Sequence, residues 1–534
     1  MQRYQLGLFV KLGFVLMLIT PGFAAISPSD AVRSLVRHSV QAMGGEERLR
    51  GLHSMSFKGI GHRYMLEQSE RPEGPWLLDY FQISEERDLD RGRIRRETKS
   101  RGCDSTECWK SAEWDPSTLI VADHVAARLN EGKTSAGQPS AVQLAEESLA
   151  LAPDRVLLLA LEAADLHSEP DIFFHGFIHH VVVFAWHDGS IKVLLSGCTD
   201  LPSAVEITRT RPYEVYWSPW GDVTTRVSYA FWMLEPGGLH YPREWSYETN
   251  GQPDWVFMVD ELTLNPFTKD EYFRIPEEIK KDFAARKVAI EDWPLGSASD
   301  RAQELAPGIV FVPGRWNIIE VRLPDGVVIL EGPISSKYSA LVIADAQKRF
   351  PGLKIKSVVT SSDAWPHIGG LREYAARGIP IYALDLNRPI LQRLFAAPYS
   401  LHPDALASHP KAPKVVYISK RAHVGIGSNA IDLIPMRTVT GERQMVVYLP
   451  GQKVLYSSDA FQRGRSGEFF LPQTLSELVD VAHREKLEIV TDVGMHIGPT
   501  PWKEIEEAIS GFRTLAQEYS GALDQVRSKQ RCAY

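Results

Sequence analysis

Residues 357–370 read S-V-V-T-S-S-D-A-W-P-H-I-G-G, and the chain continues as L-R-E-Y-A-A-R-G-I-P-I-Y-A. The β-branched run Ile355–Thr360 predicts a strand that ends in a polar loop. This loop carries His367 to a Gly-Gly step, after which Leu371–Arg377 is predicted to be a helix. In open α/β sheets, ligands and metals collect at the carboxyl ends of strands, so we expect any chemistry to lie in this loop.

The composition is that of a globular protein with more than one core. A chain of 534 residues exceeds one ordinary domain, so we expect two. Hydrophobic residues make up 44% and charged residues 24% of the chain. The net charge of -8 excludes a generally basic surface, and acidic residues precede the basic run Arg91–Arg101. We therefore expect no nucleic-acid partner.

The first 25 residues have the pattern of a secretory signal. Basic residues, an apolar run and small residues for cleavage follow one another as Arg3 and Lys11, Leu12–Ile19, and Gly22–Ala25. No later run reaches the roughly 18 uninterrupted apolar residues that a membrane helix needs. The sequence thus predicts an exported protein, periplasmic or secreted, with no membrane span after signal removal. An uncleaved membrane anchor is the alternative.

The cysteines fit an oxidising compartment. Cys103 and Cys108 lie in the short polar segment C-D-S-T-E-C, which a disulfide could close. Zinc binding by cysteine is not expected, because no C-x-x-C spacing and no paired Cys/His spacing occurs.

The N-terminal half is predicted to be mainly antiparallel β. A helix at Asp30–Met43 ends at Gly44-Gly45 and leads into a strand, and this opening resembles domains similar to periplasmic lipoprotein carriers. Strands are predicted at Val215–Trp217, Thr224–Trp232 and Pro242–Thr249, with a helical insert at Ala141–Leu166. Asn250-Gly251 predicts a two-residue hairpin turn. We interpret the aromatic residues here as the core face of the sheet, although they could instead line an apolar groove.

After a charged, Pro- and Gly-bearing segment, strands and helices alternate from Leu305 onward. Hairpins that lead into βα units predict an α/β fold of the αββα sandwich type, preceded by the mainly antiparallel β domain with helices. The predicted organisation is a signal at 1–25, a β-rich domain at 26–292, a linker at 293–304, an α/β domain at 305–516 and a tail at 517–534.

The C-terminal half, over about Leu305–Ser510, resembles the metallo-β-lactamase fold superfamily, whose members place H-x-H-x-D-H directly before Gly-Gly. Most ligand positions are degenerate. They hold Ser362, Ala364, Pro366 and, at the later histidine position, Thr440. Glu331 stands where the opening hairpins would end in aspartate. His367, Asp459 (in K-V-L-Y-S-S-D-A-F) and His496 (in V-G-M-H-I-G) occupy family positions.

The resemblance implies a site for at most one metal ion, held by His367, Asp459 and His496. Two histidines and a carboxylate suit Zn(II), Fe(II) or Mn(II). A bound cation would activate a water for attack on a carbonyl or ester of a small molecule, with Asp459 bridging or orienting that water. Asp363 is the candidate general base, and Trp365 and Tyr338 are predicted pocket walls.

Two functions therefore remain open. The first is an exported metal-dependent hydrolase of metallo-β-lactamase fold with a reduced metal site. The second is a non-catalytic binding protein, in which the N-terminal β domain holds an apolar ligand and the C-terminal domain is a pseudoenzyme. The metal content of the purified protein separates the two.

Overall fold

The computed structural model describes residues 28–67, 71, 73–101, 115–296, 301–463 and 469–513. The predicted signal at 1–25, the proposed Cys103–Cys108 disulfide and the predicted tail at 517–534 lie outside the described residues. Among the described residues, Cys198 is an exposed free thiol. No helix within these ranges is both long enough and apolar enough to cross a bilayer.

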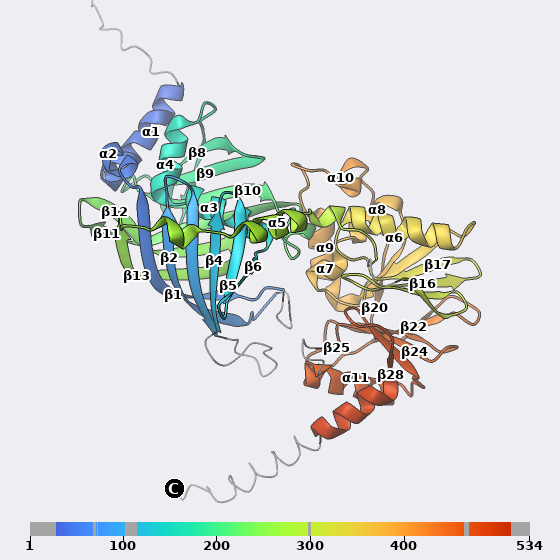
Figure 1. The fold of residues 1–534 in the computed structure, drawn as a ribbon. Coiled ribbons are helices and arrows are strands. Elements are labelled where there is room, and N and C mark those ends of the chain that lie inside the picture. The colour runs from blue at the N-terminus through green and yellow to red at the C-terminus, as the bar shows by residue number, and fades with distance from the viewer. Residues whose placement is uncertain are drawn as a thin grey trace, which may run out of the picture.

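The N-terminal half is built on one thirteen-stranded sheet in the order β6-β5-β4-β3-β2-β1-β13-β12-β11-β10-β9-β8-β7 (Figure 1). All strand pairs of this sheet among the described residues are antiparallel, and β1 pairs with β13. The strands are β1 (Ser54–Tyr64), β2 (Leu78–Asp88), β3 (Arg93–Arg101), β4 (Asp115–Ala122), β5 (Val125–Asn130), β6 (Lys133–Ala136), β7 (His167–Phe174), β8 (Phe177–Trp186), β9 (Gly189–Ser196), β10 (Pro202–Thr210), β11 (Asp222–Glu235), β12 (Leu239–Thr249) and β13 (Gln252–Leu264).

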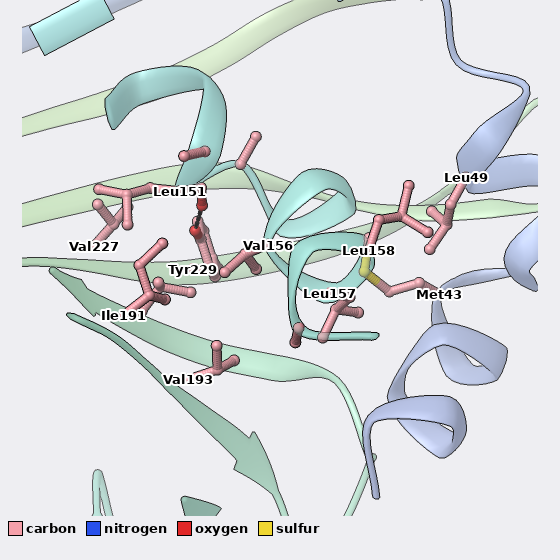
Figure 2. Close-up of a cluster of buried hydrophobic side chains, with 14 of the residues drawn as sticks. Met43, Leu49, Leu151, Val156, Leu157, Leu158, Ile191, Val193, Val227 and Tyr229 are labelled. Carbon is pink, nitrogen blue, oxygen red and sulfur yellow. Dashed lines mark hydrogen bonds between the residues drawn. The ribbon is translucent and has the colours of Figure 1, made fainter. Parts of the chain in front are cut away.

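Helices cover part of this sheet. They are α1 (Pro28–Met43), α2 (Glu46–Arg50), α3 (Pro139–Ala150), α4 (Pro153–Glu162) and α5 (Glu277–Arg286), with short 3-10 turns η1 (Ser218–Trp220), η2 (Asp270–Phe273) and η3 (Ile290–Asp292). In Figure 2, apolar side chains of α4 meet Met43, Leu49 and residues of β9 and β11. The Tyr229 hydroxyl donates to the Leu151 carbonyl there. Trp245, Tyr241 and Phe257 belong to the same buried cluster, in agreement with the core-face interpretation.

Two local predictions for this half had opposite outcomes. The Asn250-Gly251 hairpin is confirmed, because both residues have positive φ, 49° and 73°, between β12 and β13. The strand predicted at Val215–Trp217 is wrong, because these residues form a turn that runs into η1. The apolar character that suggested a strand instead serves packing against the C-terminal half.

The C-terminal half contains two larger sheets. The seven-stranded sheet comprises, in order, β14 (Gln303–Ala306), β15 (Ile309–Val312), β16 (Ile318–Leu323), β17 (Gly326–Leu330), β18 (Ile355–Val359), β19 (Ile381–Leu384) and β20 (Val415–Ile418). The six-stranded sheet comprises β21 (Ala422–Val424), β22 (Ile431–Pro435), β23 (Met445–Leu449), β24 (Val454–Ser458), β27 (Thr491–Gly494) and β28 (Thr500–Pro501). A small hairpin joins β25 (Gln462–Arg463) and β26 (Phe469–Phe470).

One buried cluster joins apolar residues of both sheets, such as Ile319 and Val328 from the first and Leu433 and Val447 from the second. The other face of each sheet packs on helices, so helices lie outside both sheets (Figure 1). These helices are α6 (Ser336–Arg349), α7 (Trp365–Ile368), α8 (Leu371–Arg377), α9 (Arg388–Ala396), α10 (Ala405–Ser408), α11 (Pro472–Arg484), a 3-10 turn η4 (Asp385–Asn387) and a helix at 502–513.

The two halves share a buried aromatic contact. Trp217 and Trp220, from the turn around η1, meet the Trp365 ring edge-on at centroid distances of 4.8 and 5.0 Å. Beside them, the Asp222 carboxylate accepts hydrogen bonds from the backbone N–H groups of Ser400 and Leu401, at 2.8 and 3.1 Å. All three tryptophans belong to the same core cluster as α6 and α8. The N-terminal half therefore completes a core of the C-terminal half.

We expect Trp220→Ala to destabilise the protein by about 3–5 kcal/mol, because it opens a cavity at this shared core. Trp220 is 1% exposed. Urea unfolding followed by circular dichroism measures the change. The control is Phe267→Ala, since Phe267 is 87% exposed and its truncation removes little packing. A Trp220→Ala effect as small as that of the control would show that the shared core contributes no stability.

Candidate metal centre

His367 lies on the short helix α7, which follows the carboxyl end of β18. Pro366 occupies the first turn of this helix, where its missing N–H costs nothing, and its carbonyl accepts a 2.6 Å hydrogen bond from the N–H of Ile334. The Gly-Gly step then allows close approach to α6. A Cβ on Gly370 would lie 2.0 Å from the Ser339 hydroxyl oxygen. These local constraints place the His367 side chain inside the protein, where it is 2% exposed.

Asp459 and His496 come from neighbouring strands of the other sheet. Asp459 directly follows β24, and His496 lies in the loop after β27. These strands pair in parallel, so both carboxyl ends open at the same edge of the sheet. β27 ends at Gly494, two residues before His496.

The three predicted ligands converge. The Nε2 atom of His367 lies 2.9 Å from Asp459 Oδ2, and Nε2 of His496 lies 3.3 Å from Asp459 Oδ1. The ring centroids of the histidines are 6.1 Å apart. One ligand atom from each of the three residues lies within 4.8 Å of the others, so this His/Asp/His group could hold a metal ion.

The pKa values of His367 and Asp459 are shifted in opposite directions by their mutual contact. Burial alone would lower the pKa of His367, but the adjacent Asp459 carboxylate raises this pKa to about 9. Burial opposes ionisation of Asp459, yet His367 and His496 hold the Asp459 pKa well below its usual range. Without a bound metal ion, His367 is therefore an imidazolium and Asp459 a carboxylate. A metal ion must displace the His367 proton, because only a neutral imidazole nitrogen coordinates.

Glu331 is a partner to which the sequence prediction gave no role, although its position had been noted. It follows β17 with a φ of 81° and is fully buried. Its Oε1 accepts a 3.2 Å hydrogen bond from the Ser361 N–H, and its Oε2 lies 4.0 Å from Nδ1 of His367. Burial raises the Glu331 pKa to about 7. Neither Oε2 nor Nδ1 has a hydrogen-bond partner among the described residues, so each faces the other.

The residues that the sequence predicted to be degenerate ligand positions have other contacts. The Ser362 hydroxyl accepts a 3.0 Å hydrogen bond from the Ala364 N–H, within the loop itself. The Thr440 hydroxyl donates to Glu477 on α11 at 2.8 Å. Pro366 is part of α7.

The remaining predicted site residues surround the group without joining it. Asp363 is partly exposed, and burial raises its pKa to about 7 against the opposing charge of Arg443. Trp365 packs between Trp217 and Trp220, at the contact of the two halves. Tyr338 is 1% exposed. Its hydroxyl oxygen lies so near Gly314 that a Cβ on that glycine would be 3.2 Å from it. The roles predicted for these residues stay predictions.

A pocket of about 740 Å³ adjoins the group, with His496 on its wall. The other lining residues are Gly296, Arg301, Gln303, Phe311, Pro313, Gly314, Arg315, Asn317 and Gly498. Asn317 fixes this wall, because its Nδ2 donates to the carbonyls of Gly494 and Ile497 at 3.2 Å each. The Asn317 N–H also donates to the Met495 carbonyl at 2.9 Å. The loop 313–317 and the loop that carries His496 are therefore held together.

The N-terminal half also faces the group, which the sequence analysis missed. The Glu67 carboxylate contributes to the raised pKa of His367. The pKa of Tyr216 is raised by burial and further by Glu67, Glu214 and Asp459. No periodicity or motif in the sequence joins residues 67 and 216 to positions beyond 360, so only the folded chain reveals this proximity.

No protein-family model matches the sequence, and no curated protein matches it. Solved structures are similar over parts of the chain. The DIM-1 metallo-beta-lactamase is 16% identical, covering 39% of this chain and 95% of its own, with a TM-score of 0.30. The stereoselective inverting sec-alkylsulfatase Pisa1 from Pseudomonas sp. is 14% identical, covering 43% of each chain, with a TM-score of 0.33. A metallo-beta-lactamase from Pontibacter korlensis is 14% identical, covering 39% of this chain and 96% of its own, with a TM-score of 0.30.

Asp492, in β27, provides a pH-dependent test of the sheet that supports the group. Its side chain is fully buried and accepts a 2.6 Å hydrogen bond from the Ser457 hydroxyl. Burial raises its pKa from 3.8 to about 7. The folded state therefore holds this proton more tightly than the unfolded state, so the stability that Asp492 contributes falls as pH rises from about 4 to about 7.

We expect Asp492→Asn to raise the melting temperature, relative to the unchanged protein, more at pH 8 than at pH 5, because an amide cannot ionise. Thermal unfolding at both pH values measures this. The control is Asp480→Asn, an exposed carboxylate on α11 that pairs with Arg513. Equal shifts at pH 5 and pH 8 for Asp492→Asn would contradict the expectation.

Proposed function

We propose that this protein is an exported hydrolase that uses at most one divalent metal ion, held by His367, Asp459 and His496. In this proposal the C-terminal half is an αββα sandwich of metallo-β-lactamase type, and the substrate is a small molecule met in the periplasm or outside the cell. The observation that carries the proposal is the convergence of two Nε2 atoms on one carboxylate from three separate strand ends.

The donor set fits a transition-metal ion. Tetrahedral coordination at bond lengths near 2.0–2.1 Å separates neighbouring ligand atoms by about 3.3 Å. The two histidine–carboxylate separations of 2.9 and 3.3 Å run to different oxygens of Asp459, and the ligand atoms of all three residues lie within 4.8 Å of one another, so small side-chain shifts would bring them to that spacing. Zn(II), Fe(II) and Mn(II) all accept two imidazoles and a carboxylate. When bound, such an ion supplies a Lewis acid with an open position, which lowers the pKa of a water towards neutrality.

The surroundings favour one ion over two. Ser362, Ala364 and Thr440 stand where a second ion would need imidazoles, and none of them offers a strong ligand for zinc. The hydroxyls of Ser362 and Thr440 already make hydrogen bonds within the protein.

The chain's own residues have distinct tasks in this proposal. Asp459 aligns the two imidazoles and orients the water. Glu331 faces Nδ1 of His367 and favours the tautomer in which Nε2 is free to coordinate. Asp363 is the candidate general base, since its raised pKa lets it take up a proton near neutral pH.

A specific observation also supports the alternative, a non-catalytic binding protein. Asp459 already bridges both histidines, so the group satisfies its own charges without a cation. In that case the C-terminal half is a pseudoenzyme scaffold, and the N-terminal β half holds an apolar ligand.

Metal content separates the two functions. We expect one ion per chain after dialysis of the purified protein against Zn²⁺ or Mn²⁺, measured by inductively coupled plasma mass spectrometry. Asp459→Asn and His496→Ala should lose it, because each removes one of three ligands. Binding should tighten as pH rises from 6 towards 9, because the metal competes with the His367 proton, whose pKa is about 9.

The matched control is His423→Ala, since His423 pairs with Asp432 on β22, outside the group. This variant should keep its metal. A protein that stays metal-free in excess Zn²⁺, and whose melting temperature is unchanged by a chelator, would overturn the hydrolase and favour the pseudoenzyme.

If Asp363 is the general base, kcat/KM for a probe ester such as 4-nitrophenyl acetate should fall as pH drops below about 7, where this carboxyl takes up its proton. Asp363→Asn should lower kcat/KM by about 10²- to 10⁴-fold and abolish that acidic limb. Stopped-flow or steady-state absorbance over pH 5–9 measures both. Asp325→Asn, an exposed carboxylate paired with Lys356, is the control. An unchanged limb in Asp363→Asn would assign the base to another group.

A further inference from the structure

Two arginines of the pocket beside His496 have no counter-charge among the residues that the structure describes. Arg301 and Arg315 both line it, and neither makes a hydrogen bond or ion pair with another described residue. Several other arginines of this half are paired, such as Arg372 with Asp404 at 2.6 Å and Arg349 with Glu320 at 2.8 Å. Two unpaired guanidinium groups at one cavity give it a positive potential, which attracts anions.

Arg315 is held in place by aromatic stacking. Its guanidinium carbon lies 3.7 Å from the centroid of the Trp293 ring. Trp293 stacks on Trp316 with centroids 6.0 Å apart at 17°. Trp316 in turn meets the His496 ring at 5.9 Å. A continuous series of planar groups therefore sets the distance between this positive charge and a ligand of the candidate metal centre.

The contact with Trp293 also leaves the N–H groups at the edge of the Arg315 guanidinium available for hydrogen bonds. A guanidinium that packs over an indole ring directs its N–H donors outward in its own plane, where they match the two oxygens of an oxyanion. Burial lowers the Arg315 pKa, a sign that the charge is partly desolvated without compensation. An anion in the pocket would supply that compensation.

We propose that this pocket binds an oxyanion group of the substrate, a carboxylate, sulfate or phosphate, through Arg315 and Arg301, so that the reacting bond lies next to His496. This inference rests on the proposed hydrolase and names its substrate class. The pocket volume of about 740 Å³ suits a small organic anion. Because Asn317 ties the Arg315 loop to the His496 loop, the binding group and the candidate metal centre keep a constant spacing.

Isothermal titration calorimetry of the full chain tests this with benzoate, phenyl sulfate and phenyl phosphate, and with benzamide as the uncharged counterpart of benzoate. We expect at least one oxyanion to bind and benzamide to bind at least about tenfold more weakly. Arg315→Gln should weaken the oxyanion by about 10- to 100-fold, because it removes charge-assisted hydrogen bonds. Arg301→Gln should act in the same direction. The tightest of the three probes identifies the oxyanion.

The matched control is Arg388→Gln. Arg388 also stacks on an aromatic ring, that of Tyr417 at 3.8 Å, but it lies outside the pocket. This variant should bind the oxyanion as the unchanged protein does. Failure of all three oxyanions to bind, or equal affinity in Arg315→Gln and Arg388→Gln, would overturn the proposal.

A second arm distinguishes this inference from the metal-dependent function. The titration is repeated with Asp459→Asn and with the unchanged protein in chelator. Retained oxyanion binding under both conditions supports the arginine site, even if the protein carries no metal. Binding that is lost under both conditions but kept in Arg315→Gln would show that the anion binds a metal ion instead, and would overturn the proposal.

Discussion

The carboxylate of Asp459 between two imidazoles is the contact on which the candidate centre depends. An ionised pair inside a protein persists only when each charge compensates the other, since transfer of either alone from water costs several kcal/mol. His367 is 2% exposed, so its proton is retained by the Asp459 charge rather than by solvent. The parallel pairing of β24 and β27 brings Asp459 and His496 to one edge, and the loop after β18 brings His367 from the other sheet.

The backbone around this centre is strained at the positions that orient it. Glu331 and Ser458 adopt positive φ values of 81° and 53°, which residues other than glycine rarely adopt. Both residues stand at strand ends, one facing His367 and one directly before Asp459. Strain of this kind survives where surrounding packing over-determines it, and it is concentrated at functional sites. Glu331, directly after β17, and Asp492, in β27, are buried carboxyls whose pKa values are raised to about 7, so their ionisation would cost free energy in the folded protein.

The N-terminal half contributes to this region through turns and loops between the strands of its sheet. Trp217 and Trp220 complete the core around Trp365, two residues from His367. Glu67 and Tyr216 interact electrostatically with His367 and Asp459. Residues of the N-terminal half therefore set part of the packing and of the charge environment of the candidate metal centre.

The local pattern of residue types in the sequence was sufficient to predict several helices and turns of the fold. The helix predicted at Leu371–Arg377 coincides with α8, the hairpin at Asn250-Gly251 is present, and the helical insert predicted at Ala141–Leu166 covers most of α3 and all of α4. These features follow from side-chain periodicity and turn chemistry, which act between near neighbours in the chain. The three ligand candidates could also be named, because each follows a recognisable strand end.

Tertiary structure alone decided how these residues meet. The turn at Val215–Trp217 was mistaken for a strand, because its apolar residues pack across to Trp365 rather than on their own sheet. Glu331 facing His367 and the stacked series from Arg315 to His496 join residues distant in the chain. Distances between such residues depend on how whole sheets and loops pack, and a linear pattern of residue types carries no measure of that packing.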